Sequence, residues 1–202
     1  MGVRSPSEAP NTLKDITLIP EEVVKCYLEP HRKYHTLEHI YNCLNAFHDL
    51  NLSLKLRPQE AADVIEAIWY HDSIYVVGAK DNEIQSAMFA RRCGVSTSIQ
   101  ALILATIYPS IDREYSNTEA AIIDADLYGL STYPSVFDHH TEQVKAEYLT
   151  AFTEAQWNDG RGKFLQSMLD QPHIYQTSYA RSQWEPKARE NIKRELTNMI
   201  TF

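Results

Sequence analysis

The sequence lacks long apolar runs and has few cysteines. Its most apolar stretches, 64–70 and 101–107, are short and interrupted, whereas ~20 apolar residues are needed to span a bilayer. The segment MGVRSPSEAP at the start contains no apolar core of a signal peptide. Cys26, Cys43 and Cys93 are widely spaced and form no CxxC pair, which argues against a disulfide framework and a cysteine zinc site. We therefore expect no membrane segment, a reducing cytoplasmic location, and cysteines that act as small buried apolar residues.

Glycine and positive charge are also scarce. Six glycines among 202 residues exclude a collagen-like or low-complexity chain. Lysine and arginine number 19 against 27 aspartates and glutamates, so the net charge is −8. Such a charge repels a phosphate backbone, and we expect no stable nucleic-acid binding. An anionic substrate would need a local positive group, for example a metal ion.

The apolar residues that are present follow the period of a helix. Alternating β-branched runs are nearly absent, whereas apolar residues recur every three or four positions. Candidate helix caps are Thr36, Asp81 and Ser96, and Pro20 and Pro58 are placed to open helices. Later helices are expected at 117–128, 134–154, 159–170 and 183–200. The pattern predicts a flexible tail over 1–12 and one all-α domain over 13–202, with about eight or nine helices.

Two short segments place histidines where a helix begins or ends. In YHTLEH, His35 and His39 are four residues apart near a helix start, so both rings can lie on one face. In WYHD, His71 and Asp72 follow an apolar helix at the point where the pattern becomes polar. Each segment alone has an ordinary explanation, a helix cap or a surface imidazole.

A third segment, IIDADL, places Asp124 and Asp126 in an apolar stretch. An unpaired carboxylate in such surroundings is costly, and a metal ion is one cation that could balance it. Asp124 could instead be an exposed residue of the helix. Together with the histidines, these carboxylates form a donor set suited to a divalent ion such as Mn, Fe, Co, Ni or Zn, and less naturally Mg.

The order of these segments resembles that of the HD-domain metal-dependent phosphohydrolases. It is closest to the small predicted HD phosphohydrolases of unassigned substrate. The segments that carry the resemblance are RKYHTLEHI, AIWYHDSIY, DNEIQSA, IIDADLYGL, VKAEY, DGRGKFL, HIYQT and EPKARENIKREL, in this order from about residue 31 to 196. The resemblance implies an all-α fold, one or more bound metal ions and hydrolysis of a phosphate ester.

The resemblance also implies a ligand set, His35, His71, Asp72 and Asp126, with Asp72 belonging to the catalytic residues as well. His35 is preferred to His39 because the ligand histidine of the HD-domain pattern stands at the start of its helix. His39 would then lie beside the ligands or face the substrate. Asp126 is preferred to Asp124 because a small residue precedes it. The choice within each pair stays open at this point.

One feature departs from the resemblance. Relatives commonly carry a histidine after the threonine of the fifth helix, whereas this chain reads ATIYPS, with Tyr108 and Pro109. No histidine occurs between residues 73 and 125. A second transition-metal ion would need extra nitrogen ligands, so we expect one ion per chain.

Further residues could contact water or substrate. Asn82 and Glu83 follow the His-Asp pair by one loop, and Glu83 could act as a general base or be a simple helix-start charge. Arg32 and Lys33 could meet a phosphate or lie in a solvated loop. Arg161 could reach an anion, although a structural ion pair is favoured.

We expect a hydrolase in which a metal-activated water attacks a small phosphate ester such as a nucleotide. Two alternatives stay open: an HD-fold di-iron oxygenase, and a helical domain that holds a metal or a partner without catalysis. The sequence does not indicate an oligomeric state.

Overall fold

The computed structural model describes residues 20–107 and 113–200, and within these ranges every regular element is helical. The elements are α2 (Glu21–Cys26), α3 (Leu37–Leu54), α4 (Pro58–Tyr70), α5 (Asn82–Arg92), α6 (Thr97–Ala105), α7 (Asn117–Asp126), the 3₁₀ helix η2 (Leu127–Ser131), α8 (Pro134–Tyr148), α9 (Glu154–Asp170), α10 (Ser178–Gln183) and α11 (Glu185–Ile200). The all-α prediction is confirmed, and the short α10 is additional to the helices expected. The predicted tail over 1–12 lies outside the described residues.

Helix starts were easier to predict than helix ends. Thr36 and Ser96 cap α3 and α6 by accepting hydrogen bonds from Glu38 N and Ile99 N. Asp81 precedes α5 but makes no such cap; its carboxylate accepts a hydrogen bond from the side chain of Gln85. The helix expected over 134–154 ends at Tyr148, and the following helix α9, capped by Thr153, begins at Glu154, five residues before its expected start.

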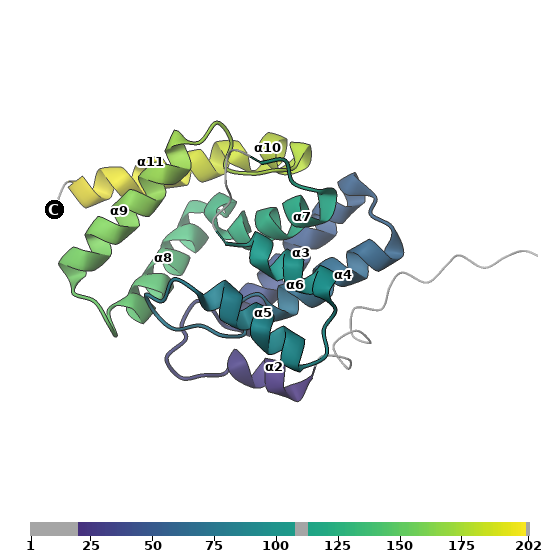
Figure 1. Cartoon of the computed structure of the whole chain (residues 1–202). Helices are drawn as coiled ribbons and strands as arrows, with labels where there is room; N and C mark the ends of the chain where they lie inside the picture. The colour runs from purple at the N-terminus through teal and green to yellow at the C-terminus, as the bar shows by residue number, and fades with distance from the viewer. Residues whose placement is uncertain (1–19, 108–112, 201–202) are drawn as a thin grey trace, which may run out of the picture.

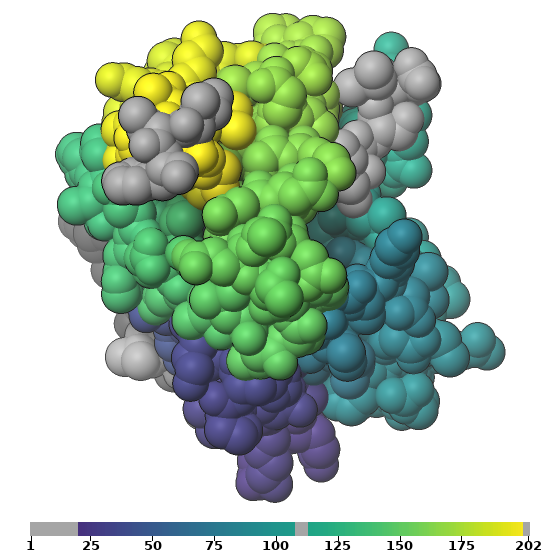
Figure 2. Space-filling model, turned by 90° about the vertical axis from the view of Figure 1, so that its left-hand side faces the viewer, coloured from purple at the N-terminus to yellow at the C-terminus, as the bar shows by residue number. Residues whose placement is uncertain are grey.

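Four helices form the centre of the molecule. α3, α4, α6 and α7 pack on one another, and α5 lies on α6 (Figure 1). α11 packs across η2 and α9, and α9 covers the middle of the face shown in Figure 2. Ile40, Leu50, Ile68, Ile103 and Ile122 are fully buried in this core. None of the helices in the described ranges has the length and apolar character required to cross a membrane.

Arg32 ties the segment before α3 to the turn after α4. Its guanidinium is buried and donates to the carbonyl oxygens of His35, Asp72 and Ser73 at 3.2, 2.7 and 3.0 Å. Its Nε donates to Glu29 at 2.9 Å. Because all of these donors are used inside the protein, Arg32 is neither a free phosphate ligand nor part of a solvated loop, which corrects both expectations from the sequence.

Glu147 ties the same segment to α8. Its Oε1 accepts hydrogen bonds from the backbone N–H groups of Lys33, Tyr34 and His35 at 2.7, 2.8 and 3.0 Å. Its Oε2 accepts from Nδ1 of His35 at 2.7 Å. Burial alone would raise the pKa of Glu147, but these hydrogen bonds and the His35 ring lower it to about 2. The carboxylate therefore stays ionised and fixes the chain just before the first turn of α3.

Replacing Glu147 should destabilise the protein in a way that depends on pH. Glu147→Ala leaves three backbone donors without a partner and should cost roughly 3–5 kcal/mol in free energy of unfolding at pH 7. Because its folded pKa is depressed, the stabilisation by this carboxylate is present above its unfolded value of 4.5 and is lost as pH falls toward about 2. Urea unfolding of wild type and Glu147→Gln between pH 6 and 2.5 measures this. Glu147→Gln should flatten that acid-side decline, and an unchanged pH dependence in the variant would contradict the assignment.

Candidate metal centre

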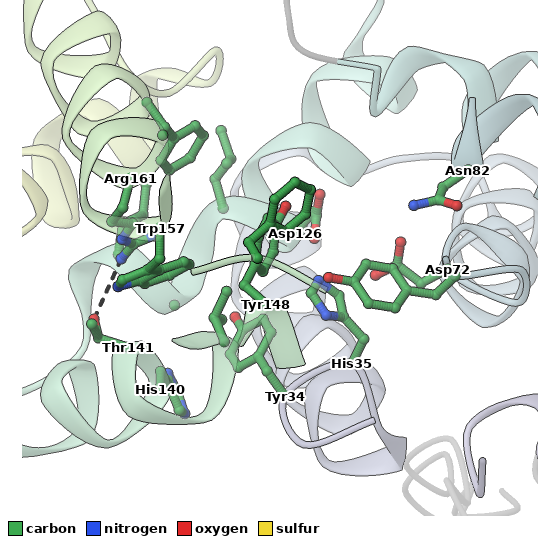
Figure 3. Close-up of a pocket in the computed structure, with 18 of the residues that line it drawn as sticks. Tyr34, His35, Asp72, Asn82, Asp126, His140, Thr141, Tyr148, Trp157 and Arg161 are labelled. Atoms are coloured by element: carbon green, nitrogen blue, oxygen red, sulfur yellow. Dashed lines mark hydrogen bonds between the residues drawn. The ribbon is translucent and has the colours of Figure 1, made fainter. Parts of the chain in front are cut away.

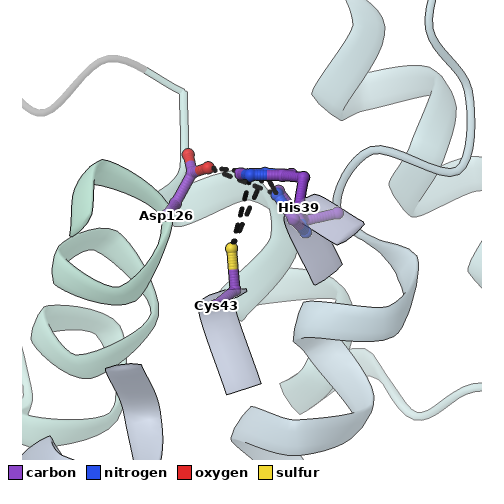
Figure 4. A group of neighbouring side chains, drawn as sticks. His39, Cys43 and Asp126 are labelled. Carbon is purple, nitrogen blue, oxygen red and sulfur yellow. Dashed lines mark hydrogen bonds and ion pairs between the residues drawn. The ribbon is translucent and has the colours of Figure 1, made fainter. Parts of the chain in front are cut away.

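Three helix ends meet at a buried cluster of donor side chains. His39 lies in the first turn of α3, His71 and Asp72 follow the last turn of α4, and Asp126 ends α7. The three helices pack pairwise, so their ends are held together by the core beneath them. Figure 4 shows His39 and Asp126 directed toward one another from α3 and α7.

The separations of the donor atoms match those around one small cation. Nε2 of His39 lies 3.3 Å from Nε2 of His71, and 3.4 and 3.2 Å from carboxylate oxygens of Asp72 and Asp126. Nε2 of His71 lies 3.1 and 3.4 Å from the same two oxygens. Nitrogen and oxygen ligands of a tetrahedral zinc ion, at ~2.0–2.2 Å from the metal, lie roughly 3.3–3.6 Å apart. These four side chains could therefore share one divalent ion.

The surroundings of His71 leave the correct nitrogen available. Its Nδ1 donates a hydrogen bond to the carbonyl oxygen of Ile68 at 2.8 Å, which leaves the lone pair of Nε2 facing the cluster. A hydrogen bond from the second ring nitrogen to a carbonyl is the usual support of a metal-binding histidine.

Cys43 also belongs to the buried group, which the sequence analysis did not anticipate. Donor atoms of His39, Cys43, His71 and Asp126 all lie within 4.8 Å of one another. However, the sulfur lies 3.6 Å from Nε2 and 3.7 Å from Nδ1 of His39. An ion bound to Nε2 lies in the ring plane, on the side of Nε2 away from Nδ1. A second ligand of that ion would therefore be much closer to Nε2 than to Nδ1. The near-equal distances place the thiol beside the ring, so we expect Asp72 to complete the donor set.

The other two cysteines differ from the sequence expectation. Cys43 is buried, as expected, whereas Cys26 is half-buried and Cys93 is exposed. Cys93 lies just beyond the end of α5, where the chain turns at Gly94, and this places it at the surface.

The buried charges of the cluster require a positive partner. Burial alone would raise the pKa of Asp72, yet the neighbouring His71 and His39 hold it well below its usual range. Burial would lower the pKa of His71, yet Asp72 and Asp126 raise it well above its usual range. Two carboxylates in this position need positive charge, which protons on the imidazoles or a divalent cation can supply.

The geometry favours His39 over His35, in contrast to the ligand set that the resemblance implies. His35 precedes the cap of α3 and donates through Nδ1 to Glu147, while its ring stacks on Tyr75 at a centroid distance of 3.9 Å. His39 is one helical turn further and directs Nε2 into the cluster. His35 still lines the neighbouring pocket, so it is placed to face a bound molecule.

Asp124 is buried but lies away from the cluster. Its two oxygens accept hydrogen bonds from the backbone N–H groups of Gln176 and Thr177, at 2.6 and 2.8 Å, just before α10. Burial raises the pKa of Asp124 to about 6, partly offset by these amides. Backbone donors therefore satisfy this carboxylate, and neither a cation nor solvent exposure is needed to explain it. Of the two aspartates, the one that reaches the cluster is Asp126.

A pocket of about 550 Å³ opens beside the cluster. Asp72 and Asp126 line it, whereas His39 and His71 lie beneath its wall. In Figure 3, Asp72 lies at one end of the pocket and Trp157 at the other. An ion held by the cluster would therefore be reached from the carboxylate side, as in catalytic sites that keep an open coordination position.

Glu83 and Asn82 both line this pocket. Glu83 is half-buried in the first turn of α5 rather than fully solvated. Burial raises the pKa of Glu83, and the negative charges of Asp72 and Asp126 raise it further. The Asn82 amide is used in both directions by the backbone of Val76, at 2.9 and 3.0 Å, so this residue shapes the loop after the cluster.

The remaining cationic candidates are held by the protein. Arg161 lies at the far end of the pocket and binds both oxygens of Glu195 at 3.0 Å, which confirms the structural ion pair. Lys33 is exposed and donates from Nζ to the carbonyl oxygen of Pro30 at 3.0 Å. Tyr108 and Pro109, which stand where the HD-domain pattern has a histidine, lie outside the described residues.

Replacing the two histidines of YHTLEH should separate their roles. His39→Ala should lose the bound ion, because it removes one of the four donors, whereas His35→Ala should retain it. Cys43→Ala should also retain the ion if the thiol only packs against His39. Elemental analysis of each purified variant after loading with Zn or Mn measures this. Metal loss in His35→Ala together with full occupancy in His39→Ala would reverse the assignment.

The two aspartates of IIDADL should separate in the same way. Asp126→Ala should lose the ion, whereas Asp124→Ala should keep it and lose roughly 1–3 kcal/mol of stability, because two buried amides lose their acceptor. Asp124→Asn is the matched control, since it preserves one carbonyl acceptor. Thermal unfolding and metal content, measured on the same samples, test both halves, and a folded Asp124→Asn without metal would refute this division of roles.

No family model matches this chain, and neither the curated proteins nor the solved structures provide a match. The buried cluster and its pocket are therefore interpreted from the residues of this chain alone. The resemblance to the HD-domain phosphohydrolases stays a prediction from the sequence.

Proposed function

We propose that this chain is a metal-dependent phosphoric ester hydrolase that acts on a small phosphate ester such as a nucleotide. One observation carries the proposal: His39, His71, Asp72 and Asp126 converge at ion-binding distances, and the two carboxylates face a pocket large enough for a small organic molecule. The resemblance of the sequence to HD-domain phosphohydrolases supports the same chemistry.

A divalent ion held by this cluster (Mn, Fe, Co, Ni, Zn or Mg) would lower the pKa of a bound water and offset charge on the phosphoryl oxygens. The need for such a cation is acute in this protein, because its net charge is −8 and the described pocket lining offers no unpaired Lys or Arg. Asp72 and Asp126 would supply the negative charge that holds such a cation, and the buried imidazoles of His39 and His71 would be its nitrogen ligands.

Glu83 is the residue we assign to proton transfer. It lines the same pocket as Asp72 and Asp126, and a raised pKa suits a carboxylate that takes a proton from an attacking water. His35 lines the pocket on a backbone fixed by Glu147, so it can orient an oxygen of the substrate. Asn82 ties the start of α5, which carries Glu83, to Val76 in the loop that follows Asp72.

The donor set favours one ion per chain. His39 and His71 belong to the cluster, and Nδ1 of His35 is bonded to Glu147. For a second transition-metal ion, the described pocket lining offers as nitrogen donors only Nε2 of His35 and the ring of His140, and the other ligands would be oxygens such as those of Glu83. This arrangement favours hydrolysis over di-iron oxygen chemistry, which would need further nitrogen donors.

Glu83→Gln should retain the ion and lose turnover by ~10²–10⁴-fold, the range for removal of a general base. The assay is a panel of nucleotides and phosphomonoesters with Mn, Co, Ni and Mg added separately, and metal content is measured on the same protein. Glu142→Gln, at an exposed position of α8 that does not line the pocket, is the matched control. Normal turnover of Glu83→Gln would remove it from the mechanism.

A metal-loaded wild type that hydrolyses nothing in the panel would favour a domain that binds without catalysis, and two irons per chain with O₂ consumption would favour an oxygenase.

A further inference from the structure

The pocket has two chemically different ends. The end near α4, α5 and α7 carries the carboxylates of Asp72, Asp126 and Glu83. The remaining wall is largely aromatic and comes mostly from α8, α9 and their connection. The aromatic lining includes Tyr34, Tyr75, Phe137, Tyr148, Phe152 and Trp157. Such a division suits a molecule with one anionic group and one flat apolar group.

The aromatic wall is built as a packed unit. The ring of Tyr148 lies 5.3 Å from that of Trp157 and stacks on that of Phe152 at 5.9 Å, measured between centroids. Trp157 is only 4% exposed, so its ring is fixed by its neighbours and supports the ring of Tyr148, which is half-buried and presents the accessible face. Rigid aromatic surfaces of this kind bind flat rings without a large loss of side-chain freedom.

The loop after His71 and Asp72 joins this wall to the cluster. Gly78 has a φ of +79°, and a Cβ added there would lie 2.4 Å from the Cζ atom of Phe152. The Phe152 ring therefore lies directly on the loop backbone, which only glycine permits at this position. Phe152 and Asp72 are thus held at a fixed spacing across the pocket.

The aromatic end offers no unpaired positive charge to a second phosphate group. Among the described lining residues, the one Lys or Arg is Arg161. Its Nε and Nη2 donate to Glu195 and Thr141, and the Glu195 carboxylate offsets its charge. Burial lowers the pKa of His140, which keeps its ring neutral at pH 7. A polyphosphate extending from the cluster would therefore place negative charge against aromatic carbon without a cation to balance it.

We propose that the preferred substrates are phosphate monoesters whose organic part is uncharged and contains a flat aromatic ring, and that polyphosphates are discriminated against. This proposal rests on the proposed function for the phosphate end, with the ring on the wall formed by Tyr148 and Trp157. The ring could be a nucleobase or a simple aryl group, since both present a flat π face.

Binding of phosphonates tests the aromatic end without requiring hydrolysis. Phenylphosphonate should bind the metal-loaded protein more tightly than methylphosphonate by roughly 5- to 100-fold, the range for stacking of one ring on an aromatic side chain. Trp157→Leu and Tyr148→Leu, each checked for folding by circular dichroism, should remove this advantage and leave methylphosphonate affinity unchanged. Trp157→Phe should preserve most of it, and Tyr133→Ala, at a residue 75% exposed and outside the pocket, should preserve all of it. Equal affinities for the two phosphonates in wild type would overturn the proposal.

Turnover distinguishes this proposal from the proposed function. Benzyl phosphate and a nucleoside 5′-monophosphate, whose leaving groups are alcohols like that of glycerol phosphate, should each exceed glycerol phosphate in kcat/KM, and the better of the two identifies the kind of ring. The matching nucleoside triphosphate should be a poorer substrate than the monophosphate, and the reverse order would overturn the proposal. If phenylphosphonate binds through Trp157 while no ester is hydrolysed, the aromatic site stands and the hydrolase function fails. If esters are hydrolysed without any preference for a ring, the hydrolase stands and the aromatic site fails.

Discussion

The constraint on which the structure depends is the charge balance at the ends of α3, α4 and α7. Asp72 and Asp126 are only 14% and 28% exposed at their side chains, and both lie against the imidazoles of His39 and His71. Carboxylates in such surroundings are stable only when positive charge lies close to them. The start of α3 and the ends of α4 and α7 must therefore stay together, and the packing of these three helices on one another supplies the rigidity that this requires.

Two buried charged residues extend that rigidity to the segments around the cluster. Arg32 joins the carbonyl groups before α3 to those of the turn at Asp72, and Glu147 holds the backbone amides of the same segment from α8. Neither residue is among the donors of the cluster. Each nevertheless satisfies backbone groups that have no helical partner, so the cluster is carried by irregular backbone without leaving that backbone unpaired. Residues that look like substrate contacts in the sequence can thus be structural, as Arg32 is.

Periodicity and capping residues were sufficient to predict the all-helical architecture, because helix formation depends on neighbours within one turn. The donors were harder to choose. The local sequence does not distinguish His35 from His39 as the metal ligand. What distinguishes them is the hydrogen bond of His35 to Glu147, which is 112 residues away along the chain. Asp124 and Asp126 likewise differ through the amides of Gln176 and Thr177, which local pattern does not reveal. Sequence reasoning also missed Glu147 itself; a glutamate on the buried side of an otherwise amphipathic helix was the available signal.

The same long-range packing decides how specific the pocket can be. A cation near Asp72 and Asp126 would attract any phosphate, because Coulombic attraction at short range distinguishes little between esters. Discrimination between esters would then depend on the part of the pocket that contacts the organic group, the wall of Tyr148, Phe152 and Trp157. Since Phe152 rests on the backbone at Gly78, six residues after Asp72, the loop that follows the donors also fixes the distance from the carboxylates to the wall. One stretch of chain would then influence both the attraction of the phosphate and the selection of the organic group. A change in that loop would alter both properties together.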